Sequence, residues 1–427
     1  MARCHGPPLW PALSGGVSGG VSGGVAVCCR NASKAGKSMD HATQVAKINQ
    51  VLGYVDAKTT CMDAGEYRNP VERYIDPERF DREMSLLIRR VPQILAHTSE
   101  IPKPGDYKTM DYAGTKLLLA RAADGTAKVF LNVCRHRGTQ LVWEERGSNK
   151  RAFVCPYHAW TFATDGRLVG IPNAEGFPSV KKEEYGLASL QSAERQGFIY
   201  AVLDPDAPEI DFDEFLGDLQ HDFHHLGLAD YKAYSPFAVP RKNNWKLAMD
   251  LFQENYHTRT THTKTIWSLF LDNIAVFDHL SPHVRGIIPK RSICELKDTD
   301  TADWNLRAHS TLLYSVFPNT MIAVLLDHAA IFRIIPVNVD ESILDFTLLV
   351  PKLPESDYAK EAWAKSLDLV KAVVGEDSER GERMMAGMYS KANKFLTFGR
   401  FEQGLGWHHE AVDQWISKPR VARAAAE

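Results

Sequence analysis

The spacing of apolar residues changes along the chain and predicts two kinds of structure. Residues 80–98 carry apolar side chains at helical intervals, which predicts a helix. From residue 99 the apolar runs become short and alternate with turns. Two runs flank Asp124-Gly125, a strong hairpin signal, and two more precede Asp165-Gly166. This pattern predicts a small all-β domain over residues 99–205.

The rest of the chain mixes both patterns. Residues 245–256 have helical spacing, residues 311–351 predict three strands separated by turns, and residues 358–395 predict one long helix or two. Helices beside an antiparallel sheet make an α+β domain. We therefore expect a larger α+β domain over residues 206–417. A helical segment over residues 39–98 is expected to join this domain.

The two ends of the chain differ from these domains. Residues 1–38 are rich in Gly, read GGVSGGVSGGV at positions 15–25, and cannot bury a core. We expect a disordered extension or a start codon placed too early, with Met39 as the alternative start, and a targeting segment stays open. Residues 418–427 are expected to form a tail.

Charge and cysteine content narrow the class of protein. The net charge is −3 and no basic run stands out, which argues against a nucleic-acid partner. No apolar run reaches the roughly 18 residues that a membrane span needs. The seven cysteines are scattered and odd in number, which favours reduced thiols and a cytoplasmic protein over a disulfide framework.

Four residues form a first candidate metal site. Cys134 and His136 make a C-x-H motif, and Cys155 and His158 make a C-x-x-H motif 18 residues later. Two thiolates and two imidazoles suit tetrahedral zinc, and they also suit a two-iron, two-sulfur cluster. The surrounding sequences, CRHRGTQL and CPYHAWTFATDGRLVGIP, resemble the Rieske [2Fe-2S] domain. The resemblance implies the two cysteines on one iron and the two histidines on the other.

One residue beside a predicted ligand departs from the family pattern. Ala159 stands where many Rieske domains have Gly. We expect its methyl group to be tolerated.

A second candidate site lies in NWKLAMDLFQENYHTRTTH at residues 244–262. His257 and His262 are five residues apart, about 140° around a helix, so they cannot both bind one ion from an unbroken helix. Thr258, Thr260 and Thr261 are poor helix formers, which predicts that the helix ends or distorts there.

This segment resembles the catalytic domain of Rieske-type non-haem iron oxygenases. The resemblance implies His257 and His262 as iron ligands, with a carboxylate completing a facial triad that leaves positions for dioxygen. The family places that carboxylate in a Glu-Asp pair opening a late helix, and Glu376-Asp377 matches, so Asp377 is expected. Asp413 is the next candidate.

Glu254 has a different expected role. It lies three residues before His257, on the same helix face. In the family a carboxylate here is an electron-transfer bridge, linking a cluster histidine of one subunit to an iron-ligating histidine of its neighbour.

The resemblance also implies an activity and partners. It implies the oxygenase component of a ring-hydroxylating system, with a START-like helix-grip catalytic domain and a head-to-tail homotrimer. Such a component uses dioxygen to mono- or dioxygenate, or demethylate, a small organic substrate. The chain lacks a G-x-G-x-x-G fingerprint and ferredoxin cysteine spacing, so a separate NAD(P)H-dependent reductase, with or without a ferredoxin, must supply electrons.

Two other classes of protein stay open from the sequence. One is a catalytically inactive Rieske electron-transfer or ligand-binding protein, and the other is a zinc-stabilised binding protein. For a substrate pocket, the aromatic residues near the second motif are candidates, namely Phe252, Trp267, Phe270 and Phe277.

Overall fold

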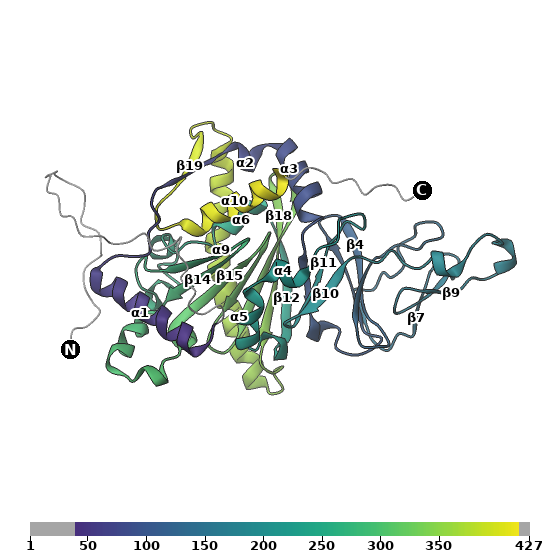
Figure 1. The fold of residues 1–427 in the computed structure, drawn as a ribbon, viewed down its shortest axis with the longest axis horizontal. Helices are drawn as coiled ribbons and strands as arrows, with labels where there is room; N and C mark the ends of the chain where they lie inside the picture. Colours follow the sequence, from purple (N-terminus) through teal and green to yellow (C-terminus); the bar gives the residue numbers. More distant parts are fainter. Residues whose placement is uncertain (1–38, 418–427) are drawn as a thin grey trace.

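A seven-stranded antiparallel sheet forms the centre of the larger part of the molecule. The computed structural model describes residues 39–417. Figure 1 shows the sheet at the centre and a smaller β domain extending to one side. The strand order is β12-β18-β17-β16-β15-β14-β13. The strands are β12 (Lys232–Arg241), β13 (Val276–Leu280), β14 (His283–Pro289), β15 (Ser310–Val316), β16 (Thr320–Val324), β17 (Ala329–Asn338) and β18 (Glu341–Val350).

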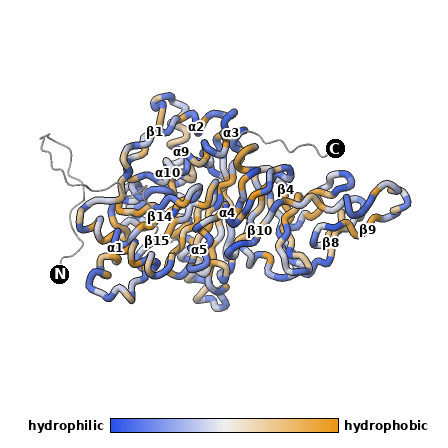
Figure 2. The backbone as a smooth tube through the Cα atoms, in the orientation of Figure 1, coloured by the Kyte–Doolittle hydropathy of each residue, from blue (hydrophilic) through white to orange (hydrophobic). Residues whose placement is uncertain are grey.

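The strand and helix predictions for this part are confirmed in kind and corrected in number. Residues 311–351 hold four strands rather than three, because each of the three turns separates two strands. The predicted late helix is a single one, α9 (Asp357–Met388), whose first turn is capped by the Ser356 side chain. Figure 2 shows hydrophobic residues concentrated along the central strands, where the core lies.

The N-terminal segment packs on this domain but is not helical throughout. Helix α1 (His41–Ala57) buries Ile48 and Val51 in the same core as the sheet. The predicted helix over residues 80–98 is wrong in its second half. Helix α3 (Pro77–Glu83) continues as a π turn, and then Pro92 and strand β2 (Gln93–His97) follow. Proline cannot continue a helix, and a short buried apolar run suits a strand as well as a helix.

The small domain is all-β, as predicted. Its hairpin at Asp124-Gly125 joins β4 and β5, and Gly125 has the positive φ of 85° that such a turn requires. The sheets are ordered β5-β4-β3-β6, β7-β8-β9 and β10-β11-β2. The strands are β3 (Tyr107–Tyr112), β4 (Thr115–Arg121), β5 (Ala127–Leu131), β6 (Arg146–Gly147), β7 (Ala152–Val154), β8 (Thr161–Ala163), β9 (Leu168–Gly170), β10 (Ser192–Arg195) and β11 (Phe198–Ala201).

Shorter elements complete the larger domain. Between residues 39 and 417, no helix combines the length and the apolar character needed to cross a lipid bilayer. The shorter elements of the larger domain are β1 (Tyr67–Pro70), α2 (Glu72–Ile75), α4 (Phe212–Leu216), α5 (Leu219–His225), α6 (Trp245–Asp250), α7 (Thr258–Thr261), α8 (Leu306–His309), β19 (Phe395–Phe398) and α10 (Gln403–Ser417).

Candidate metal centres

The two histidines of the second motif stand at the ends of a one-turn helix. Helix α6 (Trp245–Asp250) stops six residues earlier than the helix predicted over residues 245–256. Helix α7 (Thr258–Thr261) follows, with His257 directly before it and His262 directly after it. The break predicted from the threonines is therefore present but begins earlier, and Glu254 lies in the connecting segment rather than on a helix. This segment lets both imidazoles turn to one point.

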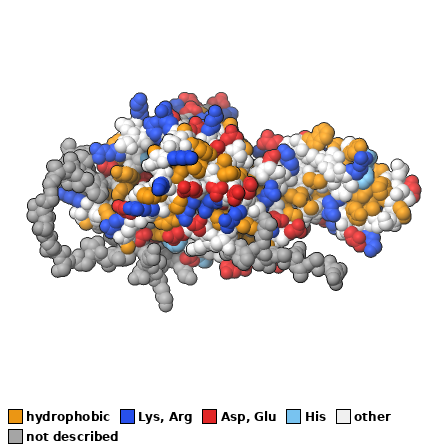
Figure 3. Space-filling view, turned by 90° about the horizontal axis from the view of Figure 1, so that it is seen from above, with side chains coloured by type: hydrophobic (Ala, Val, Ile, Leu, Met, Phe, Trp, Pro, Cys, Tyr) orange, Lys and Arg blue, Asp and Glu red, His pale blue; other side chains and the backbone are white. Residues whose placement is uncertain are grey.

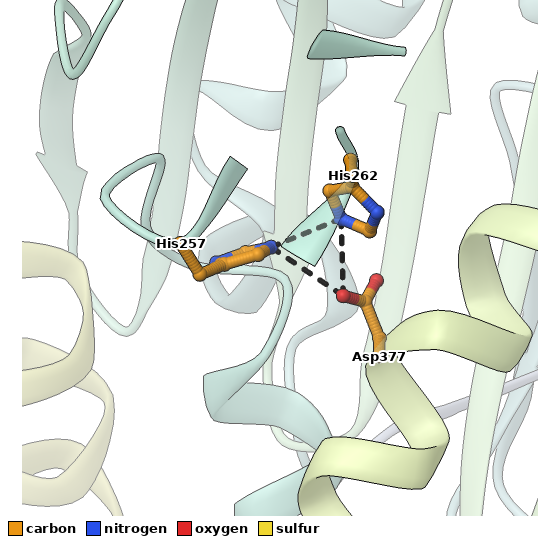
Figure 4. A group of neighbouring side chains, drawn as sticks. All are labelled: His257, His262 and Asp377. Carbon is orange, nitrogen blue, oxygen red and sulfur yellow. Dashed lines mark hydrogen bonds and ion pairs between the residues drawn. The ribbon is translucent and has the colours of Figure 1, made fainter. Parts of the chain in front are cut away.

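Asp377 completes a group of three at that point (Figure 4). Its Oδ1 atom lies 3.4 Å from Nε2 of His257 and 3.1 Å from Nε2 of His262. The two Nε2 atoms are 3.2 Å apart. Asp377 comes from the buried face of α9, more than a hundred residues further along the chain. The structure therefore brings together the three residues that the sequence suggested as iron ligands.

Each imidazole is held on its other nitrogen by a carboxylate. Nδ1 of His257 is hydrogen bonded to Glu254, which also accepts from the backbone N–H groups of Tyr256 and His257. Nδ1 of His262 is 2.8 Å from Glu376, which accepts a second hydrogen bond from Thr265. Such carboxylates fix the tautomer and leave both Nε2 atoms free to bind a metal. The role of Glu376 could not be predicted from sequence, since its contact with His262 depends on how α9 packs.

The charges at this site are strongly coupled. Burial alone would lower the pKa of His257, but the carboxylates of Glu254 and Asp377 outweigh it and raise the pKa to about 10. Burial would also raise the pKa of the Asp377 carboxyl, yet the two imidazoles lower it below its usual range. The two imidazoles therefore stabilise the charged form of the buried carboxylate.

The geometry fits a bound divalent metal. Donor atoms about 2.1 Å from one ion lie about 3.0 Å apart at right angles and about 3.4 Å apart at tetrahedral angles. The three donor separations, 3.1, 3.2 and 3.4 Å, fall within this range. Two imidazoles and one carboxylate with open positions are typical of non-haem iron(II) sites.

The alternative third ligand is excluded by its surroundings. Asp413 is ion-paired with Arg73 and, at 2.6 Å, with Arg79. Glu382, five residues after Asp377, accepts a hydrogen bond from the backbone N–H of Lys242. Neither side chain belongs to the group of three.

The first motif occupies two loops of the small domain. Cys134 lies after β5 and Cys155 directly after β7; both thiols are buried and neither forms a disulfide. Burial raises the pKa of the Cys134 thiol, and the neighbouring Cys155 adds to this shift. The rings of His136 and His158 have centroids 4.7 Å apart, and Nδ1 of His158 is buried without a hydrogen-bond partner. Two paired thiols and an orphaned imidazole nitrogen fit a metal cluster between the loops.

Aromatic residues support these loops. Trp160 stacks on the His136 ring at 4.9 Å, and Phe177 packs edge-on against both rings. Figure 3 shows hydrophobic and histidine side chains together at the surface near this end of the small domain.

Ala159, directly after His158, has a strained backbone conformation. Ala159 has a φ of 56°, in the left-handed region that glycine adopts without cost. Its N–H bonds to the carbonyl of Cys155 at 3.0 Å, which closes the turn. Ala159 is exposed, and its backbone conformation explains why glycine suits this position.

A cavity of about 310 Å³ opens directly on the group of three. His257, His262 and Asp377 form one end of it, and most of the remaining wall is aliphatic or phenyl. Of the four aromatic residues proposed as a pocket lining, Phe252 and Phe270 contribute, whereas Trp267 and Phe277 do not. The interpretation was wrong for Phe277, whose ring packs against Gly286 and Gly404 instead of lining the cavity.

Cluster-type loops in a β domain and a facial triad beside an apolar cavity together define a two-domain metalloprotein of the Rieske type. Two models of known protein families match the chain. A model described as Rieske [2Fe-2S] domain matches residues 91–182, and one described as ring hydroxylating alpha subunit (catalytic domain) matches residues 228–418. The chain therefore belongs to the Rieske-type non-haem iron oxygenases. It contains the two domains that hold a [2Fe-2S] cluster and a mononuclear iron in that family.

The names of individual relatives refer to two kinds of substrate. The chain is 34% identical over 220 residues to the chlorobenzene dioxygenase alpha subunit of Cupriavidus sp. (strain PS12), covering 49% of this chain and 48% of that one. It is 26% identical over 371 residues to the glycine betaine monooxygenase oxygenase subunit of Pseudomonas aeruginosa, covering 76% and 85%. The chain thus spans about half the length of several curated relatives that it matches.

The fold agrees with a solved structure. A quaternary ammonium Rieske monooxygenase, crystallised with an inhibitor, superposes with a TM-score of 0.72 at 21% identity, covering 83% of this chain and 96% of that one. At this identity the likeness supports the α+β fold alone.

Proposed function

We propose that this chain is the oxygenase component of a multi-component Rieske oxygenase that hydroxylates a small, largely apolar organic substrate. One observation carries the proposal: the three facing donor atoms of His257, His262 and Asp377 form the end of an apolar cavity. A site for oxygen chemistry needs open metal positions and a substrate next to them. This argues against an inactive electron-transfer protein and against a zinc-stabilised binding protein.

The proposed ligand sets follow from the two motifs. Cys134 and Cys155 would hold one cluster iron, and His136 and His158 the other. His257, His262 and Asp377 would hold the mononuclear iron. When bound, the cluster supplies electrons, and the mononuclear iron activates dioxygen at the substrate. The apolar walls exclude water from that end of the cavity, and Glu254 and Glu376 keep the imidazoles oriented.

Glu254 is proposed to connect the two centres between subunits. Its carboxylate holds Nδ1 of His257 and lines a groove on the surface as well as the substrate cavity. Figure 1 gives support, since β7 and β9 lie at the far end of the small domain, away from α6 and α9. Electrons would therefore pass from the cluster of one subunit to the iron of the next, in a homotrimer. A separate NAD(P)H-dependent reductase, with or without a ferredoxin, would reduce the cluster.

The proposal is tested by dioxygen uptake and by subunit mixing. Reduced protein should consume dioxygen in a substrate-dependent way and release hydroxylated product. Cys134→Ser and His257→Ala chains, each inactive alone, should regain part of the activity when unfolded and refolded together. Some interfaces then pair an intact cluster with an intact iron site. No recovered activity in verified mixed oligomers would exclude transfer between subunits, and no uptake with any compound of a broad panel would exclude the oxygenase.

A further inference from the structure

The substrate cavity is built on one face of the central sheet. Alternate residues of four neighbouring strands point into it, because side chains alternate across a strand. These pairs are Ile288 and Lys290, Thr311 and Leu313, Ala323 and Leu325, and Ala330 and Phe332. Helix α9 covers this face with residues at helical spacing, from Leu369 through Val373 to Asp377.

Most polar side chains of the cavity belong to the metal site or already form hydrogen bonds. Glu254, His257, His262 and Asp377 belong to the metal site. Thr258 donates to the side chain of Asn255, whose amide bonds to backbone carbonyls. Among the described residues of the lining, this leaves Lys290 and Thr311 as the polar side chains available to a ligand.

Lys290 stands at the end of the cavity away from the metal site. It follows the last residue of β14, and the nearby carboxylate of Asp327 opposes the lowering of its pKa by burial. Asp327 and His328 form the turn between β16 and β17, and His328 contacts Trp363 in the first part of α9. Within the cavity lining, α9 extends from Leu369 to Asp377, eight residues or about 12 Å along the axis at 1.5 Å per residue.

The same end is the opening of the cavity. Leu269 and Leu369 line the cavity and are 50% and 44% exposed. Lys290 is partly exposed, and its ammonium donates one hydrogen bond, of 3.2 Å, to the carbonyl of Ala308. An ammonium group has three N–H donors, so it can offer others to a molecule in the cavity.

We propose that Lys290 selects the substrate by binding a carboxylate. The substrate would be an apolar ring or chain whose anionic group stays at the opening, with Thr311 on the same wall, while its apolar end reaches the iron. This inference rests on the proposed function, because it identifies the substrate class of that same site. A cationic substrate would meet the like charge of Lys290 at the opening, where the nearby carboxylate of Asp327 is not among the residues that line the cavity.

The test is equilibrium binding by calorimetry without dioxygen, so that no turnover occurs. The probes are one-ring and two-ring aryl and alicyclic carboxylates, each compared with its primary amide and its trimethylammonium analogue. The acids should bind about tenfold more tightly than their amides, since a charge-assisted hydrogen bond contributes that much. Lys290→Met keeps the aliphatic stem and should abolish the preference, and Lys290→Glu should reverse it. Lys352→Met, which removes an exposed lysine paired with Glu355, should change nothing.

The outcomes separate this inference from the proposed function. An amide or trimethylammonium compound that binds as tightly as its acid would overturn the role of Lys290. So would an unchanged preference in Lys290→Met, or no binding by any acid. If a neutral or cationic compound then drives dioxygen uptake in protein with full iron content, the oxygenase assignment stands while the substrate class is wrong. Protein without mononuclear iron would instead overturn the proposed function.

Discussion

Glu376 and Asp377, neighbours on α9, hold the two nitrogens of one imidazole. Glu376 lies 2.8 Å from Nδ1 of His262, and Asp377 lies 3.1 Å from Nε2 of the same ring. With its proton on Nδ1, the ring presents the lone pair of Nε2 toward the proposed iron. One turn of one helix thereby supplies both a ligand and the group that orients a second ligand.

Glu376→Ala should weaken the mononuclear iron site without changing the cluster. Loss of an orienting carboxylate typically costs about 10- to 100-fold in metal affinity. The measurement is ferrous iron binding to protein whose cluster is intact, with the cluster spectrum recorded alongside. Glu379→Ala is the matched control, since Glu379 is exposed on the same helix and pairs with Arg383. Equal iron affinities in the two variants would show that the contact between Glu376 and His262 has no role.

Glu254→Ala should slow electron transfer from cluster to iron by about 10- to 100-fold. Its carboxylate holds the His257 ring and the backbone of the turn before it, so Glu254→Asp should lose less if the shorter side chain still reaches. The measurement is single-turnover oxidation of the cluster with substrate and dioxygen, at saturating ferrous iron. A wild-type rate in Glu254→Ala with full iron content would contradict the bridging role.

Ala159→Gly should stabilise the cluster loop. An L-residue in the left-handed region costs about 1 kcal/mol or more, of which the greater freedom of glycine in the unfolded chain removes part. A net gain of about 0.5 kcal/mol should raise the midpoint of thermal cluster loss by about 1–2 °C. Absorbance of the cluster during heating reports this directly. A lower midpoint would show that the methyl group makes a compensating contact.

Acid should destabilise the larger domain through His283. Burial lowers the pKa of His283 to about 4, and the ring donates to the carbonyl of Phe215 while accepting from the N–H of Phe317. The unfolded chain, with a histidine pKa of about 6.5, therefore binds the extra proton between pH 6.5 and 4. The contribution of neutral His283 to the free energy of unfolding is complete above pH 6.5. It is lost as the pH falls from 6.5 to 4, by up to about 3 kcal/mol.

The check is urea unfolding at several pH values. In His283→Asn the free energy of unfolding should change less steeply with pH across this window than in the wild type. His221→Asn, which changes an exposed histidine, should keep the wild-type slope. Equal slopes in all three proteins would show that His283 is not held neutral.

Sequence patterns predicted which residues lie together at the candidate metal sites better than they predicted the residues around them. The Cys-x-His, Cys-x-x-His and His-x4-His motifs are local, so spacing and resemblance were enough to pick their residues. Glu376 and Lys290 could not be assigned in the same way. Their roles depend on the packing of α9 against α7 and on the register of β14 in the sheet. Similarly, β2 reads as a helix until its pairing with β11 is known, since a fully buried strand has no alternation to reveal it.

One chain should hold both a Rieske cluster and a separate mononuclear iron. The most direct test is iron, zinc and acid-labile sulfide content of the wild type and of Asp377→Ala. The wild type should contain about three irons and two sulfides per chain. Asp377→Ala should contain about two irons with unchanged sulfide and cluster spectrum. Zinc in place of iron and sulfide, or three tightly bound irons in Asp377→Ala, would show that the chain does not hold these two iron centres.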